Sequence, residues 1–403
     1  MLSFGRRRKD QSPEPAGYLP GDPVPGTVAV YFADDPRRLY QLAQWLPVLE
    51  LLDDQHPVVV IARHPRTYAA LSGMTRLRCV YPPLFHHLVD LYERSDFKVG
   101  VYVNNSQHNF PSLMQRRMLH VHVNHGESDK VCMVSNQVKA YDRVFVAGAA
   151  AVRRHRAALI EFDDAALVRV GRPQLDLRPE PRLARDGRRT ILYAPTWEGE
   201  NASNNYTSVD VLGARIVAAA LSVPNTRVVY KPHPRVPPST RPAVAAAHRE
   251  IVRLLERRPG NEIALTGDIL ALFPVADLMV TDVSSVGLDF LYLRADAPLL
   301  IADRYDDRAR LHADAPVSHC ADIVDSDTVS ALADTLEHRL TDDPHRAARY
   351  AARTDYFGDL APGESTARFL AAVDDAVRTR DRGLAALDTG PTTQQLREAG
   401  EPA

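Results

Sequence analysis

The chain has 403 residues, of which 45% are hydrophobic and 25% charged, a composition typical of a globular protein large enough for two domains. Its formal net charge of −2 argues against binding nucleic acid through the charge of the whole molecule. The three cysteines, Cys79, Cys132 and Cys320, lie far apart without a CxxC pair, which disfavours disulfides and zinc ribbons and fits a reducing cytoplasm.

Residues 1–25 are rich in proline, glycine and charge and are expected to form a disordered tail. The basic run in this tail either contacts an anionic membrane, at about 1 kcal/mol per charge, or is simply solvated, which is the commoner fate of a charge run. No apolar segment follows it, so it does not read as a signal peptide, and no run of 18 apolar residues predicts a transmembrane helix. The run consists of Arg6, Arg7, Arg8 and Lys9.

The first half alternates short apolar strands with amphipathic helical stretches. Helices are predicted over 39–49, 66–72 and 149–159. Strands are predicted over 27–32, 57–62, 77–81, 99–103, 119–124, 142–147 and 167–170.

A charged, proline-rich break at 177–189 has no period of its own and reads as a linker between domains 26–176 and 190–382. The alternation then restarts and ends before a second disordered tail at 383–403. Two successive open sheets predict an α/β protein with two Rossmann-like, doubly wound domains facing across a cleft. In the second half, strands are expected over 190–196, 226–232, 277–282 and 297–303, and helices over 209–221, 244–255, 286–293, 327–340, 343–353 and 364–379.

The strand at 119–124 ends in His125-Gly126, a histidine on a sharp turn where glycine permits close backbone approach. A neutral imidazole there could take a proton from an attacking hydroxyl, or the residue could be a turn histidine without a task.

A second polar strand end is VVYKPHP, 228–234, in which Lys231 and His233 share one face and Pro232 and Pro234 stiffen the exit. This pairing of a cation with an imidazole suits a pyrophosphate, although incidental charges on a surface loop would look the same.

The third is ADLMVTDVSSVGLDF, 276–290, where a helix begins at Ser284-Ser285 after a strand. The N–H groups of a helix N-terminus form a phosphate site, while capping by Ser284 alone, worth about 1 kcal/mol, is the plainer interpretation. Asp289 on the first turns could hold a ribose hydroxyl or a positive partner.

Several other chemistries lack support. The motifs GxxxxGK[ST], GxGxxG and GxSxG are absent, which disfavours a Walker-type NTPase, NAD binding and an α/β-hydrolase. Asp325-Ser326-Asp327 resembles a metal-chelating DxD but precedes a helical stretch and reads better as an N-cap. His120 and His122 share a strand face, yet a partnered strand histidine is commoner than a metal ligand, so no metal site is predicted.

Taken in order, these segments resemble the CDP-glycerol glycerophosphotransferase family, which includes teichoic-acid polymerases and primases. The resemblance spans about residues 119–370. The matching segments are His125-Gly126-Glu127-Ser128-Asp129-Lys130, Gly171-Arg172-Pro173-Gln174-Leu175-Asp176, Ala194-Pro195-Thr196, Lys231-Pro232-His233-Pro234, Thr281-Asp282-Val283-Ser284-Ser285 with Asp289, and Gly363-Glu364-Ser365-Thr366 with Arg368.

The resemblance implies a GT-B-type fold, with residues 26–176 as the acceptor domain and 190–382 as the nucleotide-donor domain. It implies that His125 and His233 are catalytic, with His125 as the base, and that an alcohol phosphate passes from a CDP-linked donor to a lipid-linked or polymeric hydroxyl, releasing CMP. It implies no cofactor and leaves a divalent-metal requirement open. The implied donor-binding residues are Gly126, Lys130, Arg172, Pro195, Thr196, Lys231, Pro232, Asp282, Ser284, Ser285 and Asp289.

This sequence departs from the family pattern at Glu127-Ser128-Asp129, which replace Thr-Pro-Leu and add acidity beside the expected base, and at Gln174 and Val283. Two alternatives therefore stay open: a GT-B glycosyltransferase using a nucleotide sugar, and a non-catalytic nucleotide-binding relative. The expected location is the cytoplasm, with peripheral contact at the inner face of the membrane if the acceptor is lipid-linked.

Overall fold

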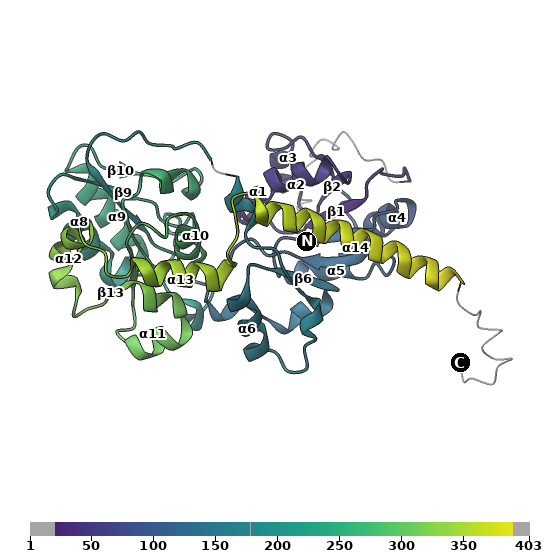
Figure 1. Cartoon of the computed structure of the whole chain (residues 1–403). Coiled ribbons are helices and arrows are strands. Elements are labelled where there is room, and N and C mark those ends of the chain that lie inside the picture. The colour runs from purple at the N-terminus through teal and green to yellow at the C-terminus, as the bar shows by residue number, and fades with distance from the viewer. Residues whose placement is uncertain (1–20, 178, 390–403) are drawn as a thin grey trace, which may run out of the picture. The chain divides into compact units, whose positions relative to one another are not determined.

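The computed structural model describes residues 21–177 and 179–389, in which two parallel α/β sheets carry the fold (Figure 1). The first sheet has the strand order β3-β2-β1-β4-β5-β6-β7. Its strands are β1 Val28–Phe32, β2 Val58–Ala62, β3 Arg78–Val80, β4 Val99–Tyr102, β5 Leu119–His122, β6 Arg143–Val146 and β7 Leu167–Arg169.

The second sheet has the order β10-β9-β8-β11-β12-β13. Both orders are doubly wound, and in the second the direction of winding reverses between β8 and β11. These two sheets confirm the predicted fold class. The strands are β8 Arg189–Ala194, β9 Thr226–Tyr230, β10 Glu262–Ile263, β11 Leu278–Thr281, β12 Leu299–Ala302 and β13 Asp322–Val324.

Helices follow most strands, as the alternation of sequence patterns predicts. Those of the first half are α1 Tyr40–Ala43, α2 Leu46–Asp53, α3 Pro65–Leu71, α4 Phe85–Arg94, α5 Phe110–Leu113, α6 Ala149–Ala158 and α7 Pro173–Asp176. Those of the second half are α8 Ala214–Ser222, α9 Pro242–Glu256, α10 Ser285–Leu293, α11 Arg308–Asp314, α12 Leu332–Arg339, α13 Arg346–Phe357 and α14 Glu364–Thr389.

The chain divides by its contacts into two units. The first comprises Met1–Val123, Ala140–Asp142 and Val373–Ala403, and the second comprises Asn124–Lys139 and Arg143–Ala372. The boundary at Ala372 falls inside α14, so this one helix supplies residues to both units.

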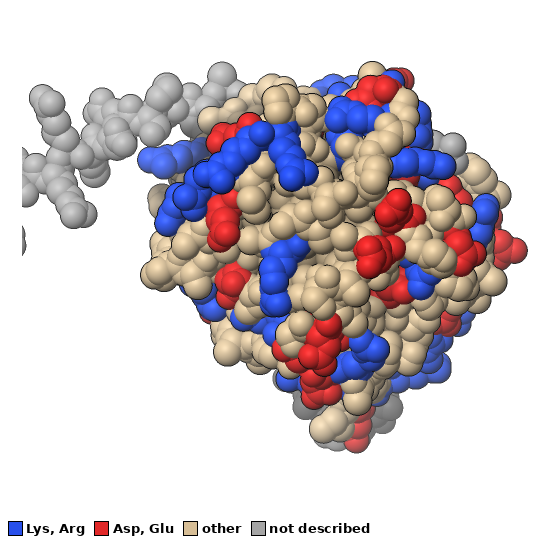
Figure 2. Space-filling view, turned by 90° about the vertical axis from the view of Figure 1, so that its left-hand side faces the viewer, with Lys and Arg blue, Asp and Glu red and all other residues tan. Residues whose placement is uncertain are grey.

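The core of the second unit has two layers, one on each face of its sheet. Successive strand residues point to opposite faces, so Ile191 and Tyr193 of β8 join one apolar cluster while Leu192 and Ala194 join the other. Helices α8, α9 and α12 supply the first cluster and α10 the second. On the side of this unit at the left of Figure 1, where α8 and α12 lie, charges of both signs are interspersed (Figure 2).

The structure differs from the predicted elements at several places. The helix expected over 39–49 is split into α1 and α2 because Pro47 occupies the first turn of α2, where its missing N–H is harmless. The helix expected over 209–221 begins as a π-helical turn, Val209–Gly213. Helices α4 and α11 and the short edge strands β10 and β13 were not predicted.

The chain termini also differ in part from expectation. Residues 21–25, assigned to the first tail, pack on α4: the Gly21 N–H donates to Asp90 at 2.8 Å and Val24 is buried. Helix α14 runs through residues 383–389, assigned to the second tail. Arg6, Arg7, Arg8 and Lys9 lie outside the described residues.

Candidate functional site at a topological switch point

The predicted site residues gather in the second unit at the carboxyl ends of β8, β9 and β11. Thr281 of β11 lies opposite Ala194 of β8, so the loops that follow these two strands start side by side. Since winding reverses between these strands, this is the position at which open α/β sheets bind their ligands.

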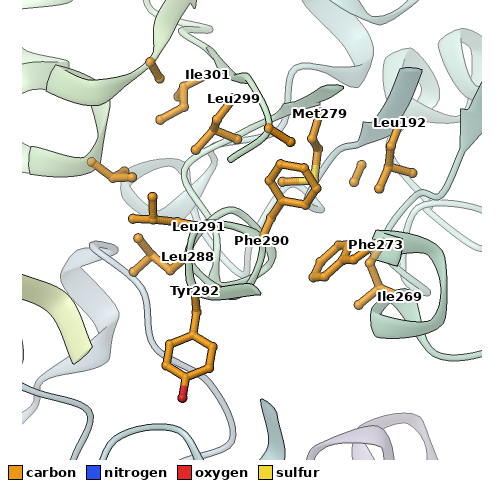
Figure 3. Close-up of a cluster of buried hydrophobic side chains, with 14 of the residues drawn as sticks. Leu192, Ile269, Phe273, Met279, Leu288, Phe290, Leu291, Tyr292, Leu299 and Ile301 are labelled. Carbon is orange, nitrogen blue, oxygen red and sulfur yellow. The ribbon is translucent and has the colours of Figure 1, made fainter. Parts of the chain in front are cut away.

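Helix α10 is fixed in place by its apolar residues (Figure 3). Leu288, Phe290 and Leu291 are at most 1% exposed, and the Phe290 ring meets Phe273 edge-on with centroids 5.2 Å apart. This packing anchors the helix, which holds its N-terminus steady at the carboxyl end of β11.

That N-terminus has no side-chain cap. Ser284 occupies the N-cap position, but its hydroxyl lies 3.4 Å from the Thr281 hydroxyl and accepts no first-turn N–H. Capping by Ser284 therefore does not explain the motif. Uncapped N–H groups together with the helix dipole favour an anion at this point.

The His125-Gly126 turn packs directly against α10. A Cβ added to Gly126 would lie 2.9 Å from the Ser285 Cβ, so only glycine permits this approach. The His125 carbonyl accepts a hydrogen bond from Arg172 Nη1 at 3.3 Å. These contacts bring the predicted base and the predicted phosphate site together.

Arg172 and Asp289 form a buried ion pair behind this turn. Arg172 Nη2 donates to Asp289 Oδ1 at 2.9 Å, and the two residues are 5% and 4% exposed. Burial raises the pKa of Asp289, and the Arg172 guanidinium opposes that rise. In this structure the pair holds the His125 turn on α10.

Lys130 reaches the loop after β8. Its Nζ donates to the Thr196 hydroxyl at 3.0 Å and lies 5.4 Å from the centre of the Tyr206 ring. Burial lowers the pKa of this ammonium, with the carboxyl group of Asp282 acting in the opposite direction.

Asp282 holds the same loop through hydrogen bonds to its backbone. Its carboxylate accepts the Thr196 N–H at 2.7 Å and the Ser208 N–H at 3.2 Å. The residue is 1% exposed, and burial raises its pKa to about 7. We therefore assign Asp282 a positioning task in the structure.

His233 follows β9 and is tied to the loop after β8. Its N–H donates to the Pro195 carbonyl at 3.0 Å, and its Nδ1 accepts the Arg235 N–H at 3.1 Å. Burial, followed by the charges of Lys130, Arg235, His125 and Lys231, lowers its pKa to about 3. The neutral ring thus carries its proton on Nε2, as a hydrogen-bond donor.

Lys231 and Pro232 are buried beside His233. The Lys231 N–H pairs with the Tyr193 carbonyl at 2.9 Å. Burial lowers the pKa of its ammonium, and so does Arg182, while the nearby Asp268 raises it. The cation and the imidazole predicted to act together are thus close neighbours.

The acidic pair beside His125 is neutralised within the second unit. Arg154 of α6 forms ion pairs with Glu127 and with Asp129, the latter at 2.7 Å, and the Tyr356 hydroxyl donates to Asp129. Arg154 was not predicted from the sequence, which carries no local signal for it, because this arginine is one of many in an arginine-rich chain.

Two further neighbours of the site were also missed. The Arg235 guanidinium stacks 3.6 Å from the centre of the Trp197 ring, next to His233. Tyr206 lies under Lys130. Arg235 and Tyr206 both belong to loops after strands, where sequence pattern alone rarely predicts contacts.

The two possible metal motifs have other partners. His120 bonds through Nδ1 to the Tyr102 hydroxyl at 2.8 Å and through Nε2 to the Gln115 carbonyl at 2.9 Å. Asp325 accepts the Thr328 N–H at 2.8 Å and so closes a turn, whereas the helical turn that follows, Val329–Ala331, has Thr328 at its N-cap position instead of a residue of the Asp325-Ser326-Asp327 segment. Within residues 21–177 and 179–389, no group of three or more His, Cys, Asp or Glu residues could hold a metal ion.

None of the helices that the structure describes is long and apolar enough to cross a membrane.

Known proteins resemble the chain at the levels of family and fold. A family model described as CDP-Glycerol:Poly(glycerophosphate) glycerophosphotransferase matches residues 103–374. No curated protein matches the sequence.

Solved structures share the fold at low identity. The wall teichoic acid polymerase TagF is 13% identical over 88% of this chain and 90% of that one, with a TM-score of 0.57. A putative UDP-N-acetylglucosamine 2-epimerase from Listeria monocytogenes is 13% identical over 89% and 98%, with a TM-score of 0.58. Anabaena Alr3699/HepE, solved with UDP and glucose, is 10% identical over 88% and 100%, with a TM-score of 0.54.

The match of the family model extends over more than half of the sequence and includes every segment around the switch point. The resemblance seen in the motifs is thereby confirmed, as is the GT-B type of its fold. The chain belongs to the CDP-glycerol:poly(glycerophosphate) glycerophosphotransferase family of enzymes.

Proposed function

We propose that the enzyme transfers glycerol phosphate, or a related alditol phosphate, from a CDP-linked donor to an acceptor hydroxyl in cell-wall or capsule polymer synthesis. The observation that carries this proposal is the meeting of the His125 turn, the loop after β8 and the α10 N-terminus at one switch point. Family membership supports the donor class, and a variant of the TagF polymerase was solved after soaking with CDPG.

The donor diphosphate would sit on the positive groups of this point. The uncapped N–H groups at Ser285 bind one phosphate, while Lys130 and Nε2–H of His233 lie to its side. Together they stabilise the charge that grows on the leaving group as the diphosphate bond breaks.

His125 is the proposed general base. It takes the proton of the acceptor hydroxyl, whose oxygen forms a bond to the phosphorus nearer the alcohol while the bond to the CMP oxygen breaks. CMP leaves with the electron pair of that bond. The Arg172–Asp289 pair keeps the His125 turn against α10 and so orients the base.

Replacing the base tests this mechanism. We expect His125→Ala to lower turnover roughly 10²–10⁴-fold while CMP binding stays close to wild type, because a general base acts mainly in the transition state. Radiolabelled transfer and calorimetry measure the two quantities, and His338→Ala, an exposed histidine of α12, is the control. An equal loss of CMP binding would make His125 a donor contact instead.

Donor choice separates the alternatives. A nucleotide-sugar glycosyltransferase of the same fold stays in question because the Anabaena structure contains UDP and glucose. Assays with CDP-glycerol, CDP-ribitol and UDP-sugars decide between them, and the absence of transfer from all three would favour a non-catalytic nucleotide-binding relative.

We further propose a lipid-linked acceptor and work at the inner face of the cell membrane. A groove in the first unit is lined by exposed apolar side chains, among them Phe85, Val89 and Met114, together with Arg116 and Arg117. Apolar side chains edged by arginines suit an anionic bilayer surface. The acceptor domain at 26–176 and the donor domain at 190–382 stay predictions.

A further inference from the structure

A narrow pocket lies in the second unit beside the α10 N-terminus. Its lining includes Val283 from the loop after β11, Asp303 from the end of β12, and Tyr206, Tyr305 and Arg310. Tyr206 is the same side chain that lies under Lys130. The pocket therefore adjoins the proposed diphosphate site, although no motif in the sequence pointed to it.

Asp303 is the buried polar group of this pocket. It is 4% exposed, and its Oδ1 accepts the Tyr305 N–H at 3.0 Å. Its Oδ2 is shielded from water and has no hydrogen-bond partner among the described residues. A buried carboxylate oxygen without a hydrogen-bond donor is destabilising, and a ligand hydroxyl that donates to it would remove that cost.

The position of Asp303 at the end of β12 indicates which ligand hydroxyl it would bind. Thr281 of β11 pairs with Ile301 of β12, so Asp303 lies level with Val283, immediately before α10. In nucleotide-binding βαβ units, a phosphate sits on the helix N-terminus, and an acidic residue about 20 residues further on, at the end of the next strand, binds the ribose diol. The segment from β11 through α10 to Asp303 has this arrangement.

We propose that Asp303 binds the ribose hydroxyls of the donor nucleotide. Asp289, which the sequence suggested for this task, is paired with Arg172. The narrow pocket suits the edge of a sugar ring, which carries two adjacent hydroxyls. Arg310, an exposed side chain, also lines the pocket, where it pairs with Asp314 at 3.3 Å.

This inference rests on the proposed nucleotide donor and names the group that recognises the sugar of that donor. Calorimetry with CMP and with 2′-deoxyCMP or 3′-deoxyCMP on the wild-type protein tests it without any substitution. We expect at least one deoxy nucleotide to bind roughly tenfold to a hundredfold more weakly than CMP, the effect of losing a hydrogen bond to a charged group.

Asp303→Asn should weaken CMP binding by a similar factor and bring the ratio of deoxy to ribo affinity close to one, while its Oδ1 can still accept the Tyr305 N–H. Asp307→Asn is the matched control, because Asp307 lines the same pocket but is exposed, and it should keep the wild-type ratio. Thermal unfolding checks that both variants fold.

Equal wild-type affinity for CMP and both deoxy nucleotides would overturn the inference, as would an unchanged ratio in Asp303→Asn. Calorimetry measures binding alone, which keeps the two proposals separate. Weaker binding of a deoxy nucleotide than of CMP, without any transfer from CDP-glycerol, would count against the proposed function only. Transfer from CDP-glycerol without sugar discrimination would count against Asp303 only.

Discussion

Two neighbouring arginines of α6 form ion pairs that differ in burial. Arg154 compensates Glu127 and Asp129, which are 6% and 7% exposed, whereas Arg153 pairs with Asp355 from a side chain that is 56% exposed. We expect Arg154→Ala to lower the free energy of unfolding by about 3–5 kcal/mol, because it strands two buried carboxylates.

The matched control, Arg153→Ala, should cost no more than about 1 kcal/mol. Urea unfolding measures both. Adding Glu127→Gln and Asp129→Asn to Arg154→Ala should recover part of the loss. Equal costs for the two arginine variants would show that the acidic pair does not depend on Arg154.

Asp282 and His233 give opposite dependences of stability on pH. Burial raises the pKa of Asp282 to about 7, so between about pH 4 and 7 the folded state holds a proton that the unfolded state has lost, and stability falls as pH rises. The pKa of His233 is lowered to about 3, so between about pH 3 and 6.5 the unfolded state holds the extra proton, and stability rises with pH.

In the wild type these two effects largely cancel between about pH 4 and 6.5. Relative to wild type, Asp282→Asn should become more stable as pH rises through this window, and His233→Gln less stable, each by at most about 1.4 kcal/mol per pH unit. Urea midpoints measured at several pH values check both signs. Parallel pH profiles for all three proteins would contradict the assignment.

At the scale of elements, the contact between the His125 turn and α10 sets the geometry of the site. Gly126→Ala places a Cβ 2.9 Å from the Ser285 Cβ, so we expect a loss of about 1–3 kcal/mol and weaker CMP binding. Adding Ser285→Gly removes the clashing atom and should restore the thermal midpoint. Gly73→Ala, where a Cβ meets nothing within 4 Å, is the control, and a similar drop there would contradict the packing argument.

Elements were predictable where a local pattern determines them. Strands β8, β9, β11 and β12 are buried apolar runs between polar loops, and the structure confirms each of them. The start of α10 after β11 was likewise visible as a strand followed by two serines.

What decides the pairing of side chains was not visible in the sequence. Arg172 and Asp289 are 117 positions apart, and no local pattern reports that they are partners. For the same reason Asp303 was missed: its importance depends on the neighbouring strand, which only the sheet order supplies. The interpretation of Ser284 as a plain cap was wrong because its hydroxyl turns toward Thr281.

At the scale of the whole molecule, the proposed membrane contact has two parts, the basic start of the chain and the groove of the first unit. Deleting residues 1–10 removes four basic residues, and Phe85→Ser with Met114→Ser removes apolar surface from the groove. We expect each change to lower binding to vesicles of anionic lipid in a flotation assay, because charge and apolar area contribute separately. Deleting residues 394–403 is the control, and unchanged binding in both test variants would retire the proposal.

The division of α14 between the two units has a consequence for synthesis on the ribosome. The first unit includes residues from both ends of the chain, and Val373 and Val377 of α14, which belong to it, are buried. A nascent chain therefore has its amino-terminal sheet strands long before the part of α14 that belongs to the same unit has been translated. Until α14 has been translated, apolar surface on these first strands stays uncovered, which makes them the stretch where chaperones should bind while the polypeptide is being made.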